Sequence, residues 1–326
     1  MAMGFGRRTA FALGMAPLAA WAQGMQDRFP DRPLKLIVPF PPGGPVDAAA
    51  RIVAQALAPL LGQQVVVENR SGAGGSVGID AVAKAVPDGF TLALGSTGAV
   101  AVNVSLIPNL SYDPRRDLVP VGMVSGVPSL LVVRPGLPVR DMAGLLALVR
   151  QKPGGLTFAS TGPGGTPHLA AELLKLRAGL DIVHVAYRGA APAITALLGN
   201  EVDMAFLDLS VLLPQVRDAA LRPMALAAAE RSPALPAVPT LAEAGIAGVE
   251  VENWYAVMAP ARVPPERLAV LAAALRGAMA QPETASRFTA QGARVIGGMP
   301  EAAATFIAAE IERWAEVVRR ADIKPD

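Results

Sequence analysis

A short strand that runs through a glycine turn directly into a long helix is the feature that most constrains this fold. Residues 34–38, LKLIV, are apolar and partly β-branched, as in a buried parallel strand. The turn Phe40-Pro41-Pro42-Gly43-Gly44 follows, and apolar residues then recur at helical spacing from Val46 to Leu61. Such a turn presents unpaired backbone N–H groups and the positive end of a helix dipole, which suit an anion. Taken alone, an ordinary βα connection whose glycines permit positive φ is the commoner meaning of this pattern.

The same arrangement returns in the second half of the chain. Residues 156–159 are typical of a strand, residues 160–167 of a glycine turn, and residues 168–178 of a helix. Two halves that start in the same way predict two similar α/β domains with mainly parallel sheets covered on both faces. Ligands bind such sheets at the carboxyl ends of the strands.

Further elements follow from the same periodicities. We expect strands at residues 64–68, 90–94, 119–124, 129–133, 182–185, 202–206, 224–227 and 252–258. We expect helices at residues 79–85, 141–150, 191–198, 211–219, 264–280, 283–291 and 300–321, with a short one opened by a capping box at Thr240. The first domain is expected to pass into the second between the strands at 119–124 and 129–133.

The N-terminus is typical of an export signal. Arg7 and Arg8 precede an apolar run over residues 10–20, and Ala20-Trp21-Ala22 gives an A-x-A cleavage pattern before Gln23. We therefore interpret residues 1–22 as a signal peptide, with the general secretory route favoured over the twin-arginine route. The run is too short to span a bilayer, so the mature protein is expected to be soluble and outside the cytoplasm, which for the family named below is the periplasm.

Charge and cysteine content exclude several classes of protein. The chain has 29 basic and 27 acidic residues, and removing Arg7 and Arg8 leaves 27 of each. A neutral protein without a basic cluster has no field for holding nucleic acid, so no nucleic-acid partner is expected. The absence of cysteine excludes disulfides, thiolate metal sites and cysteine nucleophiles.

Enzyme and cofactor motifs are incomplete. Neither the segment around Ser96 nor the one around Ser160 fits the G-x-S-x-G nucleophile elbow. The glycine-rich residues 72–78 lack the last glycine of G-x-G-x-x-G, because Val77 stands there. Metal-ligating residues do not cluster, so we expect no catalytic residue, metal or cofactor. His184 is interpreted as a packed strand residue, whereas His168 either caps a helix or lines a cleft.

Long ordered segments resemble the Bug family, the periplasmic solute receptors of tripartite tricarboxylate transporters. They include PDRPLKLIVPFPPGGPVDAAAR, ENRSGAGGSVGIDAVAKAVPDGFTL, SYDPRRDLVPV, FASTGPGGTPHLAAELLK, VHVAYRGAAPAITALLGNEVDMAFL and RSPALPAVPTLAEAG. The resemblance runs from about Phe29 to the C-terminus. It implies a periplasmic-binding-protein fold of two α/β lobes joined by crossing hinge strands, which close on a ligand. The implied lobes are residues 23–125 with 245–326, and residues 126–244.

The resemblance also implies a ligand-binding site. Its loops hold the ligand's carboxylate largely through backbone amides and ordered waters, and further positions line or border the cleft. The implied residues are Phe40, Pro42, Gly43, Gly44, Asp47, Ser96, Thr97, Ser160, Thr161, Gly162, Gly164, Gly165, Thr166, His168, Tyr187 and Asp208.

Structural explanations of some of these residues stay open. For Asp47, a favourable interaction with the helix dipole is preferred to a contact with the ligand. Asp208 is explained equally by an N-cap. Tyr187 and Arg188 are explained equally by packing at the rim of a lobe.

Three positions depart from the family's usual polar residues. They are Val46, Pro163 and Gly165, and each removes a polar side chain. A less polar or bulkier ligand, such as an aromatic or branched acid, is therefore a hypothesis beside the di- and tricarboxylates.

The implied function is capture of a small organic carboxylate and its delivery to the membrane subunits of the transporter, by a protein expected to be a monomer. Two alternatives remain. An exported α/β hydrolase would need a nucleophile such as Ser160 or Ser96 within hydrogen-bond reach of His168. A receptor of the same fold could instead present its ligand to a signalling kinase.

Overall fold

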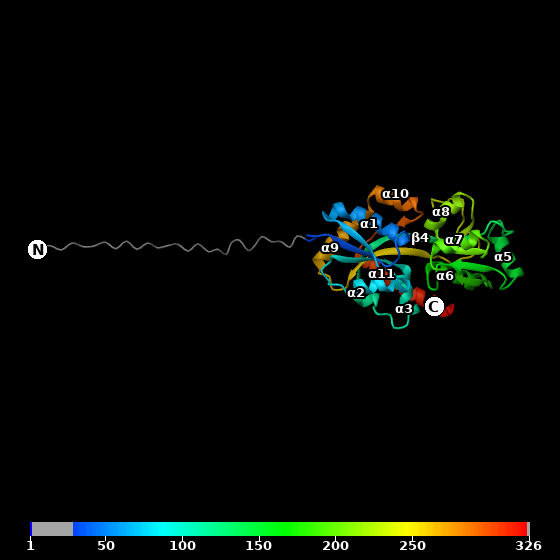
Figure 1. The fold of residues 1–326 in the computed structure, drawn as a ribbon, viewed down its shortest axis with the longest axis horizontal. Helices are drawn as coiled ribbons and strands as arrows, with labels where there is room; N and C mark the ends of the chain where they lie inside the picture. The colour runs from blue at the N-terminus through cyan, green and yellow to red at the C-terminus, as the bar shows by residue number, and fades with distance from the viewer. Residues whose placement is uncertain (2–28, 325–326) are drawn as a thin grey trace.

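The computed structural model describes Met1 and residues 29–324. The expected signal peptide, apart from Met1, lies outside the described residues. Figure 1 shows two lobes next to each other, with α1, α9 and α10 in one lobe, α5 to α8 in the other, and β4 between them. No helix in the described part of the chain is both long and apolar enough to cross a membrane.

The first lobe is built on parallel strands followed by one antiparallel strand. β1 (Leu34–Val38) lies between β2 (Val65–Asn69) and β3 (Thr91–Ser96), parallel to both. β9 (Glu252–Pro260) then pairs antiparallel with β3 and carries the sheet to β4 (Leu118–Val133). The expected strand, glycine turn and helix at the start of the chain is confirmed, with α1 at Pro45–Leu61.

The second lobe repeats this plan. β5 (Thr157–Ser160) lies between β6 (Val183–Ala186) and β7 (Met204–Asp208), parallel to both. β7 and β8 (Arg222–Ala227) pair antiparallel with β4, and β10 (Arg294–Val295) adds a short antiparallel pair to the same strand. The outer strands of each lobe are thus parallel, and the strands between them are antiparallel.

One sequence prediction is wrong at the passage between the lobes. Residues 119–124 and 129–133 belong to a single strand, β4, of 16 residues. Its first part, through Pro128, pairs with β9, and from Ser129 it pairs with β7 and β8. Neighbouring strands satisfy its backbone along the whole length, so Ser125-Gly126 and Pro128 do not end it. β4 therefore runs through both lobes.

The helices lie close to their expected positions. They are α2 (Ser76–Ala83), α5 (Met142–Gln151), α6 (Thr166–Ala178), α7 (Ala190–Leu198), α8 (Leu209–Arg217), α9 (Pro265–Met279), α10 (Pro282–Ala290) and α11 (Pro300–Arg320). Sequence reasoning did not find the short elements η2 (Ala73–Gly75), η3 (Thr97–Val102), α3 (Asn103–Leu106) and α4 (Pro114–Asp117). The capping box forms, because Thr240 and Glu243 exchange hydrogen bonds, but it opens only a turn.

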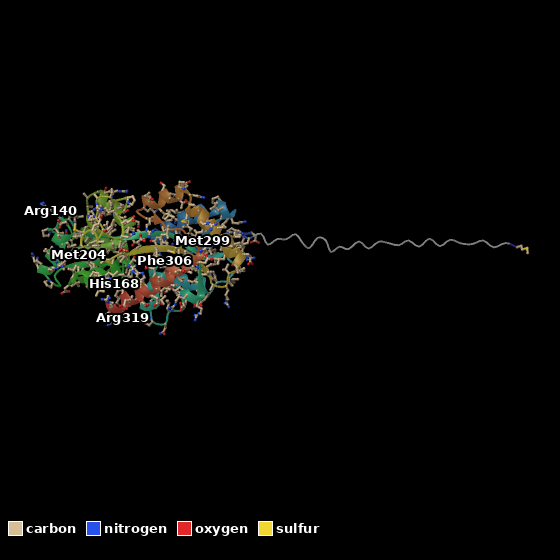
Figure 2. The ribbon with its side chains drawn as sticks, turned by 180° about the vertical axis from the view of Figure 1, so that it is seen from behind. Arg140, His168, Met204, Met299, Phe306 and Arg319 are labelled. Atoms are coloured by element: carbon tan, nitrogen blue, oxygen red, sulfur yellow. The ribbon has the colours of Figure 1, made fainter. Side chains whose placement is uncertain are left out.

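The long C-terminal helix packs on the sheet as its apolar stripe predicts. Ile307, Ile311 and Trp314 of α11 are buried in the core, whereas Phe306, in the same stripe, is 39% exposed. The Trp314 indole N–H donates to Glu310 at 2.8 Å, so the buried indole keeps a polar partner. Figure 2 shows His168 on the side of the second lobe that faces α11, in agreement with contacts between α6 and α11.

Candidate functional site

The first glycine turn is held by the side chain of Asp47. The Gly43 N–H donates to Asp47 Oδ2 at 3.0 Å, and Arg51 and the Asn69 amide also donate to this carboxylate. Burial alone would raise the pKa of Asp47, but these hydrogen bonds and the Arg51 charge lower it below its usual value. Asp47, which is only 3% exposed, therefore orders the turn with its side chain.

The second glycine turn is held in the same way by His168. The Gly164 N–H donates to His168 Nδ1 at 3.1 Å, four residues ahead, as Gly43 does to Asp47. The sequences PGGPVD (residues 42–47) and PGGTPH (residues 163–168) therefore fold alike at the starts of α1 and α6. The amides of Gly43 and Gly164 are thus used inside the protein.

Other amides in both turns are free. Within residues 29–324, no acceptor is present for the N–H groups of Gly44, Val46 and Asp47 at α1, or for those of Thr161, Thr166 and His168 at α6. Both helices begin with their N–H groups and positive dipole end directed at the turn. Each turn can therefore bind an anion through its backbone.

Both turns border the segment that follows β3. A Cβ atom on Gly75 would lie 3.0 Å from both the Phe40 ring and Ala99, so Phe40 lies beside η3. A Cβ atom on Gly164 would lie 2.0 Å from Leu106 and 3.7 Å from Val102, so the second turn packs against η3 and α3. The segment from 97 to 106 therefore lies next to both turns.

Ser96 and Thr97 use their hydroxyl groups within the protein. Ser96 Oγ accepts from the Ala99 N–H at 3.4 Å. Thr97 Oγ1 accepts from the Trp254 N–H at 2.9 Å and donates to the Glu252 carbonyl at 3.2 Å. Both residues are buried, and the two bonds of Thr97 tie the residue that follows β3 to β9.

Two histidines stack beneath the second turn. The rings of His168 and His184 lie 4.0 Å apart and nearly parallel, and Phe158 continues the stack. His184 Nε2 is 2.7 Å from Ser160 Oγ, which also accepts from the Gly162 N–H. Burial, reinforced by His168, lowers the pKa of His184 to about 4. Ser160 thus contacts His184 and not His168, the histidine that the hydrolase alternative required. No carboxylate in the described residues forms a hydrogen bond with His184.

Asp208 ends β7 next to the start of α6. Its Oδ2 accepts from the Asn253 amide at 2.9 Å, and the neighbouring Thr166 hydroxyl favours the ionised form of the carboxyl group. It occupies the N-cap position of α8 without a capping bond from its side chain. Asn253, a polar residue near the start of the apolar strand β9, was not found by sequence reasoning, although its polarity in that strand was the available signal.

Tyr187 lies at the end of β6, beside the second turn. Its N–H donates to the Ser160 carbonyl at 3.1 Å, and its side chain is half-buried. The neighbouring Arg188 is exposed. Tyr187 is therefore placed near Ser160 and Gly162, while Pro42, Gly44 and Gly165 lie within the two turns themselves.

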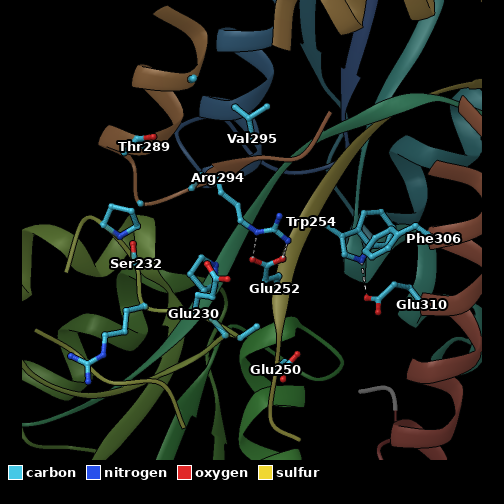
Figure 3. Close-up of a pocket in the computed structure, with 18 of the residues that line it drawn as sticks. Glu230, Ser232, Glu250, Glu252, Trp254, Thr289, Arg294, Val295, Phe306 and Glu310 are labelled. Carbon is cyan, nitrogen blue, oxygen red and sulfur yellow. Dashed lines mark hydrogen bonds and ion pairs between the residues drawn. The ribbon is translucent and has the colours of Figure 1, made fainter. Parts of the chain in front are cut away.

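A separate cavity of about 640 Å³ lies along the crossing strands (Figure 3). Its floor includes Pro128, Glu252 and Trp254, and its walls come from residues 228–233, 289–295 and α11. Arg294 and Glu252 form a bidentate ion pair in it. None of the residues predicted for the ligand site lines it. Sequence reasoning missed this cavity because it joins segments far apart in the chain.

Two α/β lobes that share crossing strands, with a free-amide helix start in each, define a solute-binding protein of the periplasmic-binding class. The chain belongs to the tripartite tricarboxylate transporter receptor family. The family model "Tripartite tricarboxylate transporter family receptor" matches residues 49–323. Protein BugT of Bordetella pertussis is 42% identical over 299 residues, which cover 91% of this chain and 92% of BugT.

Solved structures agree with this assignment. The structure "R. palustris Rpa4515 with adipate" is 35% identical, has a TM-score of 0.85 and matches 91% of this chain and 100% of that one. MatC of Rhodopseudomonas palustris with bound malate is 34% identical, has a TM-score of 0.78 and matches 89% of this chain and 100% of that one. The expected family and fold are thereby confirmed.

Proposed function

We propose that this receptor captures a small organic carboxylate between its lobes and delivers it to the membrane subunits of a tripartite tricarboxylate transporter. The free amides at the starts of α1 and α6 carry this proposal. They offer a negative group several N–H donors in a fixed geometry without a cationic side chain. Adipate and malate in the two related structures support a carboxylate as the ligand class.

The proposal includes export and closure. The signal-like residues 1–22 support a location in the periplasm, where the receptor would meet the solute before the membrane subunits do. A ligand that bridges both lobes favours the closed state, because it gains contacts there that the open state lacks. We expect movement about the segments where β4 and the chain before β9 pass between the lobes.

Side-chain polarity in the turns bears on the ligand class. Val46 is buried in the core, so it contributes its backbone N–H and no polar side chain. A Cβ atom on Gly165 would lie 2.9 Å from the Thr161 hydroxyl, so little room remains there for a polar side chain. We keep an aromatic or branched acid beside the dicarboxylates in the set to be tested.

Isothermal titration calorimetry and thermal shift test the proposal. The acids are adipate, malate, citrate, succinate, glutamate and benzoate, each against glucose as a neutral control. We expect at least one acid to bind and to raise the melting temperature, and glucose to do neither. Failure of every acid to bind would overturn the proposed ligand class.

The contact between Ser160 and His184 gives the hydrolase alternative a specific test. A serine 2.7 Å from a neutral imidazole has the first two members of a nucleophilic arrangement. We expect no turnover of p-nitrophenyl acetate above that of the Ser160→Ala variant. Turnover that disappears in this variant would favour the enzyme.

A further inference from the structure

Asp208 is a buried carboxyl group with one oxygen left over. It is 6% exposed, and its backbone pairs with Ser129 across β4 and β7. Its Oδ2 accepts from the Asn253 amide at 2.9 Å, whereas its Oδ1 has no hydrogen-bond partner among residues 29–324. A buried polar atom without a partner is costly, so its partner is expected to come from outside the protein or with a change of protonation.

The groups around Asp208 do not supply a positive charge. Thr166 on α6 and Asn253 on β9 are neutral, and the Tyr255 phenol is a titratable group that also faces it. On α6, His168 accepts from Gly164, and Glu172 pairs with Lys175. No lysine or arginine forms an ion pair with Asp208 in the part of the chain that the structure describes.

The pKa of the Asp208 carboxyl group is raised, as expected for a buried acid without a positively charged partner. Burial raises the pKa of Asp208 to about 6, and hydrogen bonds from Asn253 and Thr166 only partly offset this. The group is therefore mostly ionised at neutral pH in the free protein but is close to the point at which it protonates.

Asp208 also lies next to the second glycine turn. Thr166, whose hydroxyl group lowers the pKa of Asp208, is the first residue of α6, and its own N–H is one of the free amides. An anionic ligand at these amides would bring a second negative charge next to a buried carboxylate. Two negative charges so close together in a buried site raise the free energy of the complex, so either the ligand or Asp208 takes up a proton.

We propose that Asp208 takes up one proton when the receptor binds its carboxylate and then donates a hydrogen bond from Oδ1 to the ligand. Oδ2 receives the Asn253 N–H and so acts as the acceptor oxygen, which leaves Oδ1 for the proton. The proton comes from solvent, and no covalent bond in the ligand changes. This inference rests on the proposed function and deepens it, because it makes uptake of the solute dependent on pH.

Proton uptake gives a quantitative expectation. With a free pKa of about 6, and with Asp208 fully protonated in the complex up to pH 8, binding at pH 7 takes up about 0.9 proton per ligand. Affinity then falls nearly tenfold from pH 7 to pH 8. Adipate and the other mono- and dicarboxylic acids of the set are almost fully ionised throughout this range, so the titration of these ligands does not contribute.

Calorimetry in buffers of different ionisation enthalpy tests the inference. The probes are adipate first and then the other acids named above, in phosphate and in Tris at pH 7 and pH 8. For the wild type we expect buffer-dependent heats that give nearly one proton at pH 7. For Asp208→Asn, which keeps a donor at this position but does not titrate, we expect equal heats in both buffers and an affinity independent of pH.

Controls separate the outcomes. Asp218→Asn changes an exposed acid in the same lobe, and its proton uptake should equal that of the wild type. An acid that binds the wild type without proton uptake, or with the same uptake in Asp208→Asn, would overturn the role of Asp208 and leave the receptor function standing. If no acid binds, both proposals fail. If Asp208→Asn does not fold, a wild-type affinity that is constant from pH 7 to pH 8 still overturns the inference.

Discussion

The Gly164 N–H donates to Nδ1 of His168 at 3.1 Å, and this bond is the counterpart of the 3.0 Å bond from Gly43 to Asp47. Because Nδ1 accepts this bond, neutral His168 carries its proton on Nε2, which faces Glu172 at 3.7 Å. A histidine and an aspartate thus do the same structural work in the two lobes. Each uses one glycine amide and leaves the neighbouring amides for a ligand.

Replacing His168 by alanine should loosen the second turn. The Gly164 N–H would lose its acceptor in a buried position, so we expect a loss of about 1–3 kcal/mol in unfolding free energy. Carboxylate binding should weaken about tenfold. Urea unfolding and calorimetry measure both effects.

The matched control is His168→Asn, because the short side chain of Asp47 reaches the equivalent amide in the first turn. It should retain most of the stability and affinity. Equal behaviour of the alanine and asparagine variants would contradict the role given to the Gly164 bond.

Gly164→Ala should destabilise the protein for two reasons. Gly164 has φ +70°, and an added Cβ would lie 2.0 Å from the Leu106 side chain. Backbone strain and overpacking together predict a loss of about 2–4 kcal/mol, measured by urea unfolding.

Two variants separate these causes. Gly179→Ala has a similar φ of +63° but open space around the new methyl group, so it should lose only about 1 kcal/mol. In the background of Leu106→Ala, the Gly164→Ala change should lose its steric part and behave like Gly179→Ala. A full penalty in that background would show that the contact with Leu106 is unimportant.

Acid should destabilise the protein through His184. Its pKa is about 4 in the folded protein, below its ordinary value of 6.5, because burial and then His168 disfavour its charge. Its contribution to stability is therefore complete above pH 6.5 and is lost as the pH falls towards 4. We expect a loss of about 1–3 kcal/mol between pH 7 and pH 4.5 that His184→Gln largely lacks.

Ser160→Ala provides the control for this pH dependence. It removes the hydrogen bond to His184 but keeps the imidazole, so stability should fall at every pH while the acid-dependent loss remains. Urea unfolding at the two pH values measures this. An acid-dependent loss that is unchanged in His184→Gln would assign it to other groups.

The titration of Asp208 should change stability with pH in the direction opposite to that of His184. Its pKa of about 6 lies above its ordinary value of 3.8, so its contribution to stability is complete below 3.8 and is lost as the pH rises through 6. Relative to Asp208→Asn, the wild type should therefore lose about 1–3 kcal/mol between pH 4 and pH 7. A constant difference between the two proteins would contradict the raised pKa.

Local patterns predicted most helices and strands because their causes lie close together in sequence. Asp141, expected to cap a helix, accepts from the Gly144 N–H at 2.8 Å. The continuity of β4 could not be predicted, because it depends on four other strands, β7, β8, β9 and β10, that pair with it. Gly126 and Pro128 would end a strand only where such neighbouring strands are lacking.

The candidate site was predictable in its loops but not in its hydrogen bonds. The two glycine turns are visible in the sequence, yet which amides are free depends on whether Asp47 and His168 turn back to their glycines. The partner of Ser160 also depends on tertiary packing, since β5 and β6 place His184 rather than His168 beside it. Asn253 meets Asp208 only because β9 and β7 flank the same strand.

Backbone amide NMR during titration with adipate, and then malate, tests the central claim most directly. If two helix starts grip a carboxylate, the N–H signals of Val46 and Asp47 at α1 should shift together with those of Thr166 and His168 at α6. Signals that move only around the cavity at the crossing strands, such as the Trp254 indole N–H, with both turns unchanged, would contradict the account.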